Sequence, residues 1–331
     1  MTKLFVTGGT GLLGRTFLES ISNENEKKVT ASFRSSKSLK KTEHTSIDVN
    51  WVKGKLSDVS FLSDHIKEGM IVVHIAGLVS YDPADKDLLT KVNVEYTRNV
   101  VNVCLDKKVK KLIFISSIAA IGRSGVNAHL HEDTKWVDSS QNTYYAISKY
   151  NAELEVWRGA EEGLNVQVLN PSIILGKGID KNESSTSLIT QMIDHPQYYV
   201  EGSINFVDVR DVVVAINKAI NLDLENDRYI ISAGNVSIKE FMQKLSTLLK
   251  TPSPTKKLSL YHLKFMVWTD YAQSLLFKKK RKITSESLKT ISSNYTYDNR
   301  KAQEKLGIEF KSLEESLEWL APFYVENYLN P

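Results

Sequence analysis

The amino-acid sequence predicts an α/β protein built on a doubly wound parallel sheet, with a smaller, mainly helical second domain. Short, continuous apolar runs alternate with longer amphipathic stretches over the first 120 residues, and a glycine-rich turn directly follows the first run. Continuous apolar runs are typical of strands buried on both faces. Strand–helix alternation of this kind implies right-handed crossovers between parallel strands.

The apolar runs give the positions of the expected strands and helices. Strands are predicted at Lys3–Thr7, Val29–Phe33, Ile71–Ile75, Leu112–Ser116 and Val166–Leu169. The intervening amphipathic stretches predict helices over about residues 11–22, 88–105 and 145–161.

The pattern changes after Pro171. Residues 176–199 are polar and are interpreted as mostly loop, and residues 206–220 and 229–232 resume the strand and helix pattern. From Val236 onward the chain is expected to be helical, with helix starts at Ser237 and Ser312. These changes predict a first domain of residues 1–170 plus 205–235, and a second of residues 171–204 plus 236–331 that packs over the strand ends.

Composition excludes several classes of function. The chain has 331 residues, 25% of them charged, and a net charge of only +4, which indicates no nucleic-acid partner. Its single cysteine, Cys104, cannot form an intrachain disulfide, and the histidines show no metal-ligand spacing. No stretch reaches the roughly 18 apolar residues of a membrane span, and no signal peptide is recognised, so a cytoplasmic protein is expected.

A phosphate-binding turn is predicted directly after the first strand. Gly8, Gly11 and Gly14 follow the GxxGxxG spacing between that strand and a helix. The first glycine permits the tight turn, the second lets backbone approach a pyrophosphate, and the third permits close helix packing. Free N–H groups at the helix start then favour the phosphates. The alternative interpretation is an ordinary loop.

The end of the second strand indicates which dinucleotide is bound. Proteins that bind NAD usually place a carboxylate there to hold the ribose hydroxyls. This chain has Ser32, Phe33, Arg34, Ser35, Ser36 and Lys37 instead. Arg34 could pair with a 2′-phosphate and Lys37 could assist, so NADP(H) is favoured over NAD(H). The alternative is a solvated basic loop.

Tyr145 and Lys149 form the candidate catalytic pair. They are four residues apart, so a helix places both side chains on one face. A phenol with its usual pKa of about 10 is a poor acid at neutral pH, but a nearby ammonium stabilises the phenolate and lowers that pKa. Tyr145 could then give a proton to a carbonyl or take one from an alcohol. Tyr144 is a poorer candidate because its partner at this spacing is Ser148.

A serine hydroxyl completes the candidate site. Ser116 and Ser117 end the strand that precedes the pair by roughly thirty residues. A hydroxyl there would face the same crevice and could hydrogen-bond a substrate carbonyl. We favour Ser117 over Ser116, although either could be an ordinary cap of a turn.

Together these motifs resemble the extended short-chain dehydrogenase/reductase family, which includes NAD(P)-dependent epimerases and dehydratases. The resemblance is carried by TGGTGLLG, by VVHIAG at residues 72–77, by SSIAAIG and by YAISK. NPSIILG at residues 170–176 and FVDVRD at residues 206–211 add to it, so that it covers most of the chain.

The resemblance implies a role for each matching residue. Tyr145 would be the acid–base residue, Lys149 would hold the nicotinamide ribose and tune Tyr145, and Ser117 would orient the substrate. The remaining residues expected around the cofactor are Gly8, Thr10, Gly11, Leu12, Leu13, Leu56, Ala76, Gly77, Pro171, Ile173 and Ile174. Asn93 matches a structural asparagine, and Asp208, Arg210 and Asp211 are expected to form a structural ion-pair corner. Family members are often dimers, so a homodimer is a possible assembly.

One position departs from the family pattern. The family often has an acid after the third-strand glycine that contacts adenine, whereas Lys55 follows Gly54 here. The adenine contact would then be lost or supplied by backbone. Asp58, three residues later, is expected to cap a helix.

Three functions remain open within this resemblance. The favoured one is an NADP(H)-dependent reductase or dehydrogenase similar to dihydroflavonol reductases and 3β-hydroxysteroid dehydrogenases, which acts on a small substrate. The second is a nucleotide-sugar epimerase or dehydratase, for which an acid at the second strand and a pair of cations for the diphosphate would be expected. The third is a regulator without catalysis, which would not need Ser117, Tyr145 and Lys149.

Residues 258–277 are rich in apolar and aromatic side chains and precede the basic run 278–282. The favoured interpretation is a helix that covers an apolar pocket, with Tyr261, Phe265, Trp268 and Tyr271 indicating an apolar or aromatic substrate. The alternative is a helix lying at an anionic lipid surface.

Overall fold

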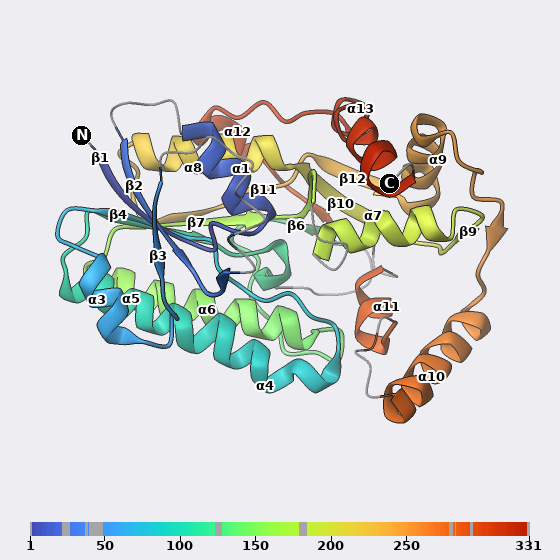
Figure 1. The fold of residues 1–331 in the computed structure, drawn as a ribbon, viewed down its shortest axis with the longest axis horizontal. Helices are drawn as coiled ribbons and strands as arrows, with labels where there is room; N and C mark the ends of the chain where they lie inside the picture. Colours follow the sequence, from blue (N-terminus) through green and yellow to red (C-terminus); the bar gives the residue numbers. More distant parts are fainter. Residues whose placement is uncertain are drawn as a thin grey trace.

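A parallel sheet of seven strands forms the centre of the described chain in the computed structural model (Figure 1). The structure describes residues 2–21, 27–36, 39, 49–122, 128–178, 184–277, 281, 283–291 and 294–329. The strand order is β11-β7-β5-β4-β1-β2-β3, and every pairing is parallel. The strands are β1 (Thr2–Thr7), β2 (Lys27–Phe33), β3 (Asn50–Lys53), β4 (Ile71–His74), β5 (Lys111–Ile115), β7 (Val166–Pro171) and β11 (Asp227–Ile231). The predicted doubly wound α/β class is therefore confirmed.

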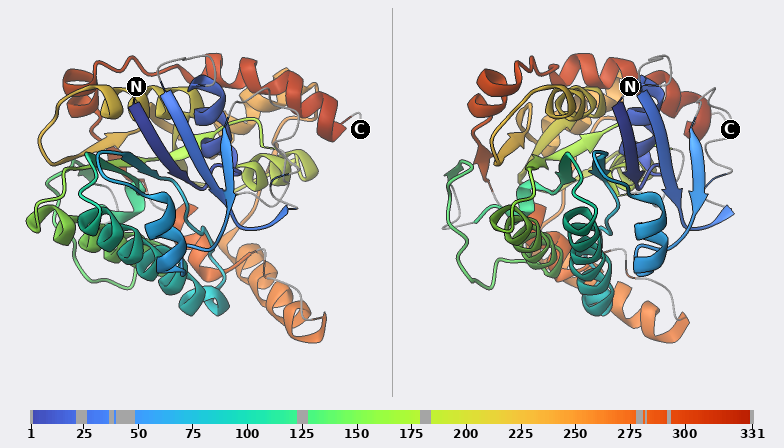
Figure 2. Two further views of the ribbon diagram at one scale, coloured as in Figure 1. Left: turned by 60° about the vertical axis from the view of Figure 1, so that its left-hand side comes forward. Right: turned by 90° about the vertical axis from the view of Figure 1, so that its left-hand side faces the viewer.

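Helices cover both faces of this sheet, as Figures 1 and 2 show. One face carries α1 (Leu12–Ile21), α8 (Val209–Asn221) and α12 (Arg300–Leu306). The other carries α3 (Val59–His65), α5 (Tyr96–Asp106) and α6 (Tyr144–Glu161). Each layer encloses its own apolar core, one around Phe17 and Ile216 and one around Phe114 and Val156. The continuous apolar runs are thus buried on both sides, as their composition predicts.

The helix predicted over residues 88–105 is present but irregular. It begins as α4 (Lys86–Leu89), passes through a π-helical turn over Thr90–Glu95 and continues as α5. The wide turn carries the buried Asn93. π-helical turns of this kind are frequent at functional sites, because the extra residue re-aims a side chain.

A smaller unit with its own core follows the main sheet. Its mixed three-stranded sheet has the order β12-β10-β8, made of β12 (Gly234–Ser237), β10 (Ser203–Asp208) and β8 (Ile173–Leu175). The helices α7 (Ser184–Asp194), α9 (Ile238–Leu249) and α13 (Leu313–Tyr324) accompany it. Two short ladders join β9 (Tyr198–Tyr199) to β13 (Lys256–Lys257) and β6 (His129–Leu130) to β14 (Thr296–Tyr297).

The interpretation of residues 176–199 as mostly loop was wrong. Helix α7 occupies most of the described part of that stretch, and its Ile189 and Met192 are buried in the core of the small unit. The stretch has few apolar residues, but they lie three residues apart and face the same core, where burial outweighs a weak local helix preference.

Helix caps and the ion-pair corner agree with the sequence. The side chains of Asp58, Ser237 and Ser312 accept hydrogen bonds from backbone N–H groups at the starts of α3, α9 and α13. Asp208 pairs with Arg210 at 2.6 Å, and Asp211 accepts from the backbone N–H of Lys311 at 2.8 Å. Asp208 therefore holds the side chain of Arg210 at the start of α8, and Asp211 links α8 to the chain before α13.

Helix α10 (Leu260–Phe277) projects from the body of the protein beside the short α11 (Ser285–Ile291), as Figure 1 shows. The expectation that its aromatic residues cover an apolar pocket is wrong. Tyr261, Phe265, Trp268 and Tyr271 are between 48% and 85% exposed.

The start of α1 leaves no space for a side chain at Gly14. A Cβ built there would lie 2.2 Å from the carbonyl oxygen of Gly8 and 2.7 Å from the Cα of Gly9. At Gly11 the nearest atom would be 3.6 Å away, an ordinary contact. The third glycine of the turn is therefore required by packing of the chain against itself.

We predict that Gly14→Ala lowers the free energy of unfolding by about 1–3 kcal/mol or more, because the backbone must shift to admit the methyl group. Gly11→Ala is the matched control and should change stability by less than about 1 kcal/mol. Urea unfolding followed by circular dichroism measures both. Equal stability of the Gly14→Ala variant and the native protein would contradict this account.

Candidate active site

The predicted site residues converge at the edge of the sheet where the parallel strands end. Gly8 follows β1, Arg34 follows β2, Ala76 and Gly77 lie just beyond β4, and Ser117 lies just beyond β5. Pro171 is the last residue of β7, and the half-buried Ile173 and Ile174 belong to β8. Ligands of open α/β sheets bind outside the carboxyl ends of the strands, so the arrangement is that of a ligand site.

The glycine turn is held against the end of β4. Gly8 has φ +74°, and a Cβ on it would lie 2.6 Å from the backbone nitrogen of Ala76. The N–H of Gly11 donates to the carbonyl of Gly8 at 3.2 Å, and the N–H of Arg15 donates to the carbonyl of Gly11 at 2.9 Å, which starts α1. Thr10 and Leu12 are half-buried beside this turn, whereas the side chain of Leu13 is buried in the core.

Lys149 is buried at the centre of the site. Its Nζ donates to the carbonyl of Ile115 at 2.9 Å and lies 4.8 Å from the centre of the Phe114 ring. A Cβ on Gly77 would come within 3.8 Å of the same Nζ. Burial lowers the pKa of Lys149 to about 8, against the opposing charge of Glu153. The ammonium therefore lies beside the backbone of Gly77, which the sequence motifs predict to line the cofactor.

Tyr145, and not Tyr144, turns toward the interior. Tyr145 is 8% exposed and packs edge-on against Tyr81, with ring centroids 5.9 Å apart. Tyr144 is 36% exposed, and Lys86 lies over its ring. Tyr145 and Lys149 lie one turn apart on the buried side of α6, the juxtaposition that their spacing predicts.

The two serines after β5 have different environments. The Ser117 hydroxyl accepts from the N–H of Ala119 at 3.1 Å and begins the single turn Ile118–Ala120, which packs against Tyr145 through Ala119. The Ser116 hydroxyl is buried and has no hydrogen-bond partner within the described residues. The same holds for the buried Ser172 hydroxyl, just beyond β7. The choice of Ser117 over Ser116 as the catalytic serine stays a prediction.

Arg34 and Leu56 lie at the sheet edge, whereas Lys37 lies outside the described residues. The side chain of Arg34 is exposed immediately after β2. Leu56 is half-buried, and its carbonyl accepts from the Asn99 side chain at 3.1 Å. Lys55 is exposed in the loop before α3. These positions are open to a ligand that extends from the glycine turn along β2.

Sequence reasoning missed a buried histidine under the site. His74 Nδ1 lies 2.6 Å from the Thr7 hydroxyl, and His74 Nε2 lies 3.0 Å from the Thr97 hydroxyl. The Thr97 hydroxyl donates to the carbonyl of Asn93, so it accepts from Nε2–H, and Nδ1 accepts from Thr7. A histidine at the end of a run of buried apolar residues was the available signal, because buried polar groups require partners.

A second missed group stabilises Lys149 and the serine turn together. Asn170 donates to the carboxylate of Glu153 at 2.5 Å and to the carbonyl of Ser117 at 2.9 Å. Glu153 is 1% exposed and also faces Arg228 at 3.4 Å. The carboxylate thus partly offsets the lowering of the Lys149 pKa by burial, and it holds the Ser117 backbone through Asn170.

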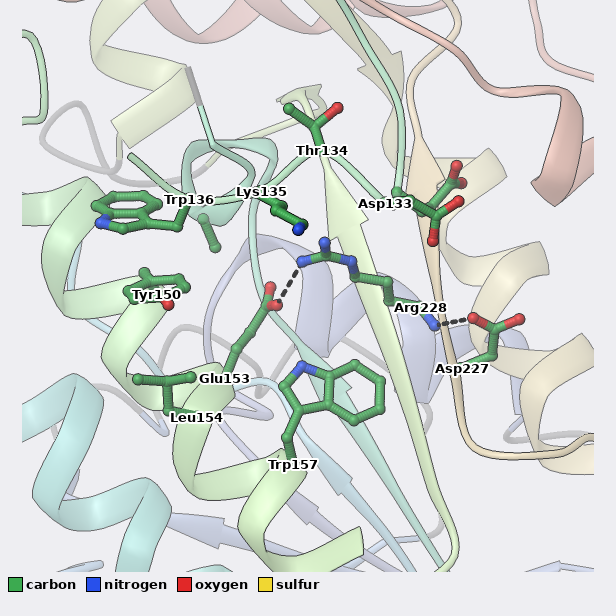
Figure 3. A pocket seen from close by; sticks show the side chains of 12 residues that line it. Asp133, Thr134, Lys135, Trp136, Tyr150, Glu153, Leu154, Trp157, Asp227 and Arg228 are labelled. Carbon is green, nitrogen blue, oxygen red and sulfur yellow. Dashed lines mark hydrogen bonds and ion pairs between the residues drawn. The ribbon is translucent and has the colours of Figure 1, made fainter. Parts of the chain in front are cut away.

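A pocket of about 500 Å³ lies on another face of α6 (Figure 3). Tyr150, Glu153 and Trp157 of α6 line it with Arg228 and the loop around Trp136, and Trp136 stacks on Tyr150 at 4.3 Å. None of the residues predicted for the active site lines this pocket. It is therefore a separate feature from the strand-end site.

Two kinds of feature are absent from the described residues. No group of histidine, cysteine, aspartate and glutamate side chains there is arranged to hold a metal ion. Among the same residues, no helix has the length and apolar character needed to cross a bilayer.

The strand order, the glycine turn and the Tyr145–Lys149 pair define a Rossmann-type oxidoreductase fold with a site for a dinucleotide. The family comparison agrees: residues 4–232 match the model of the NAD dependent epimerase/dehydratase family. The chain belongs to this family, within the extended short-chain dehydrogenases/reductases, as the sequence motifs predict.

Similar proteins include both reductases and epimerases. The chain is 27% identical over 318 residues to a putative dihydroflavonol 4-reductase of Synechocystis sp., covering 95% of this chain and 92% of that protein. The crystal structure of gox2253 superposes with a TM-score of 0.81 at 25% identity over 99% of both chains. UDP-glucuronic acid 4-epimerase from Bacillus cereus, in complex with UDP-glucuronic acid and NAD, has a TM-score of 0.76 at 16% identity over 99% of this chain and all of the other. The last likeness shows the fold alone.

The buried His74 makes the stability of the protein depend on pH. Burial, with the charge of Lys149, lowers the pKa of His74 from 6.5 to about 3. Between these values the unfolded chain binds a proton that the folded protein does not, so stability falls as the pH falls. From pH 6.5 to about pH 5 one such group removes about 2 kcal/mol.

We predict that His74→Gln removes this part of the acid sensitivity, because glutamine does not titrate. Urea unfolding at neutral pH and at about pH 5 should show a smaller loss of stability in the variant than in the native protein, by about 2 kcal/mol. His195→Gln, at an exposed histidine, is the matched control and should lose as much as the native protein. The same loss in His74→Gln and the native protein would show that His74 does not control acid stability.

Proposed function

We propose that the protein is an NADP(H)-dependent reductase or dehydrogenase that interconverts a carbonyl and an alcohol on a small substrate. The observation that carries this proposal is the placement of Lys149 beside the backbone of Gly77, with Tyr145 one turn away on the same buried side of α6. The main sheet would bind the cofactor, and the small unit would contribute the substrate side of the site.

The residues present fit a dinucleotide. The turn of Gly8 and Gly11 brings backbone N–H groups to the start of α1, where a pyrophosphate is favoured. Gly77 leaves room for a ribose near the Lys149 ammonium, which could hold its hydroxyls. The buried hydroxyls of Ser116 and Ser172, without partners in the described part of the chain, add polar groups at the same edge. When bound, the cofactor supplies or accepts the hydride.

The chain's own residues handle the proton. The Tyr145 phenol would donate its proton to the substrate oxygen during reduction and take it back during oxidation. The charge of Lys149 favours the phenolate that is left, so the proton transfer costs less. The Ser117 hydroxyl would donate to the same substrate oxygen and hold it at Tyr145. Tyr81, packed on the Tyr145 ring, limits the directions that the ring can adopt.

The preference for NADP(H) rests on Arg34. It is exposed at the end of β2, where a family member selective for NAD would place a carboxylate. Lys37 would assist from three residues further along. A guanidinium can pair with a 2′-phosphate through two hydrogen bonds, which accounts for a preference between otherwise identical cofactors.

The alternative function is nucleotide-sugar epimerisation or dehydration with a retained cofactor. It is supported by the epimerase neighbours, which share the fold. The reductase is favoured because the similarity to the putative dihydroflavonol 4-reductase extends over 95% of the chain, and because no acid stands at the end of β2. A panel of aldehydes and ketones tested with NADPH, beside UDP-sugars tested by product analysis, separates the two. Conversion of UDP-sugars alone would overturn the proposal.

We predict that Tyr145→Phe lowers turnover by about 10²–10⁴-fold, the usual contribution of a positioned acid–base group. Binding of NADPH should be unchanged in calorimetric titration. Tyr144→Phe is the matched control, since its ring is turned outward, and it should keep the native rate. Native turnover in Tyr145→Phe would exclude this residue as the proton donor.

We predict that Arg34→Ala weakens the binding of NADPH by about tenfold or more, the effect of losing a charge-assisted pair worth about 1.5–3 kcal/mol. The affinity for NADH should change little, because NADH lacks the 2′-phosphate. Calorimetric titration of the native protein and the variant with both cofactors measures the preference. Equal weakening for NADPH and NADH would assign Arg34 a structural role instead.

A further inference from the structure

Glu153 is a buried carboxylate to which the proposed reaction assigns no step. It is 1% exposed and follows Lys149 by four residues, so both side chains lie on the same side of α6. A glutamate is almost never fully buried unless partners replace its contacts with water. Within the described residues its partners come from two directions, the active site and the pocket of Figure 3.

On the active-site side, Glu153 is connected both to Lys149 and to the turn of Ser117. The Asn170 amide donates to Glu153 at 2.5 Å and to the carbonyl of Ser117 at 2.9 Å. Both of these partners can only accept, so the NH₂ group of Asn170 must face them and its orientation is fixed. The charge of Glu153 also acts on Lys149, against the effect of burial. One carboxylate thus contacts the supports of two predicted catalytic groups.

On the pocket side, Glu153 faces Arg228 of β11, as Figure 3 shows. The two groups are 3.4 Å apart, longer than the roughly 2.7–2.9 Å of a good charge-assisted hydrogen bond. The Arg228 side chain is 21% exposed and lines the pocket, where water screens its charge. A long, partly screened ion pair contributes little, so Arg228 alone does not account for burying the carboxylate.

The other titratable groups near these residues do not replace Glu153. His74 on β4 and Tyr145 on α6 lie on the Lys149 side, and His74 is neutral at neutral pH because its pKa is about 3. Four further charged residues line the pocket beside Arg228, namely Glu132, Asp133, Lys135 and Asp227. Among the described residues, Glu153 is the one acid whose charge raises the pKa of Lys149.

We propose that Glu153 is a positioning residue of the active site, which keeps the Lys149 ammonium charged beside Gly77 and holds the turn of Ser117. Its role in turnover rests on the proposed function, in which a charged Lys149 favours the Tyr145 phenolate. Without this acid, burial of Lys149 would be opposed only by neutral groups such as the carbonyl to which it donates. Lys149 would then lose its proton at a lower pH. Glu153 therefore sets the upper limit of the pH range in which Lys149 is charged.

Titration of Lys149 in the free, full-length protein tests the proposal. Nuclear magnetic resonance of protein labelled with ¹³C at the lysine Cε atoms follows each lysine with pH, and Lys149→Met identifies the signal of Lys149. The native midpoint should lie near pH 8, below the value of about 10.4 for exposed lysines. Glu153→Gln keeps the size of the side chain and an acceptor for Asn170 but removes the charge. Its Lys149 midpoint should fall by about 1 or more in pH.

The matched control is Glu155→Gln on the same helix. Arg98 at 2.7 Å and Arg158 at 3.0 Å hold that carboxylate outside the site, so this variant should keep the native Lys149 midpoint. Arg228→Gln removes the Glu153 ion pair from its pocket end and should not lower the midpoint. An unchanged midpoint in Glu153→Gln would overturn the proposal, and so would an equal fall in Arg228→Gln, which would indicate a common structural effect.

Circular dichroism checks that each variant folds. If Glu153→Gln alone does not fold, Glu153→Gln combined with Arg228→Gln leaves neither member of the ion pair without its partner and should show the same fall in the Lys149 midpoint. The titration needs neither cofactor nor substrate, so it decides the effect of Glu153 on Lys149 even if no carbonyl compound is reduced. Where turnover with NADPH is found, its loss at alkaline pH should begin about 1 lower in pH in the Glu153→Gln variant. Loss at the native pH, despite a lowered midpoint, would overturn the role of Glu153 in turnover.

Discussion

The candidate site depends on one buried positive charge. The Lys149 ammonium has left water, and an isolated buried cation is too costly to keep unless partners replace its hydration. The carbonyl of Ile115, the face of the Phe114 ring and the Glu153 carboxylate provide that replacement. Phe114 and Ile115 are consecutive residues of β5, and Glu153 lies one turn after Lys149 on α6, so α6 must pack on β5 before the lysine can be charged in this position.

The neutral state of His74 follows first from its burial and then from the same charge. Two cations near one another in a buried region would repel, and Lys149 contributes to the lowered pKa of His74. Neutral histidine can accept from Thr7 and donate to Thr97, and so it links β1 to α5 under the glycine turn. Ala76 N–H also donates to the Thr7 hydroxyl, at 3.2 Å. The backbone next to the predicted cofactor is therefore held by hydrogen bonds that need an uncharged imidazole.

The sequence predicts a structural feature well when the residues that cause it are close together in the chain. The strands, the caps at Ser237 and Ser312 and the Tyr145–Lys149 face follow from periodicity and spacing within a few residues, and all are present. Helix α7 does not, because its stability comes from Ile189 and Met192 reaching a core made by distant elements. The network of Glu153, Asn170 and Ser117 likewise could not be predicted from the sequence. Its members come from α6, β7 and the turn after β5, which are far apart in the chain.

Helix α10 shows that the spacing of apolar residues alone does not predict what covers them. An apolar stripe indicates that a face avoids water, but it does not say whether protein or another apolar phase covers that face. The same residues were consistent with a helix that covers a pocket, and only their exposure in the structure contradicts that interpretation. The contacts of Arg281 with Asp82 and of Thr284 with Tyr81 place the chain that follows this helix beside the ring that packs on Tyr145.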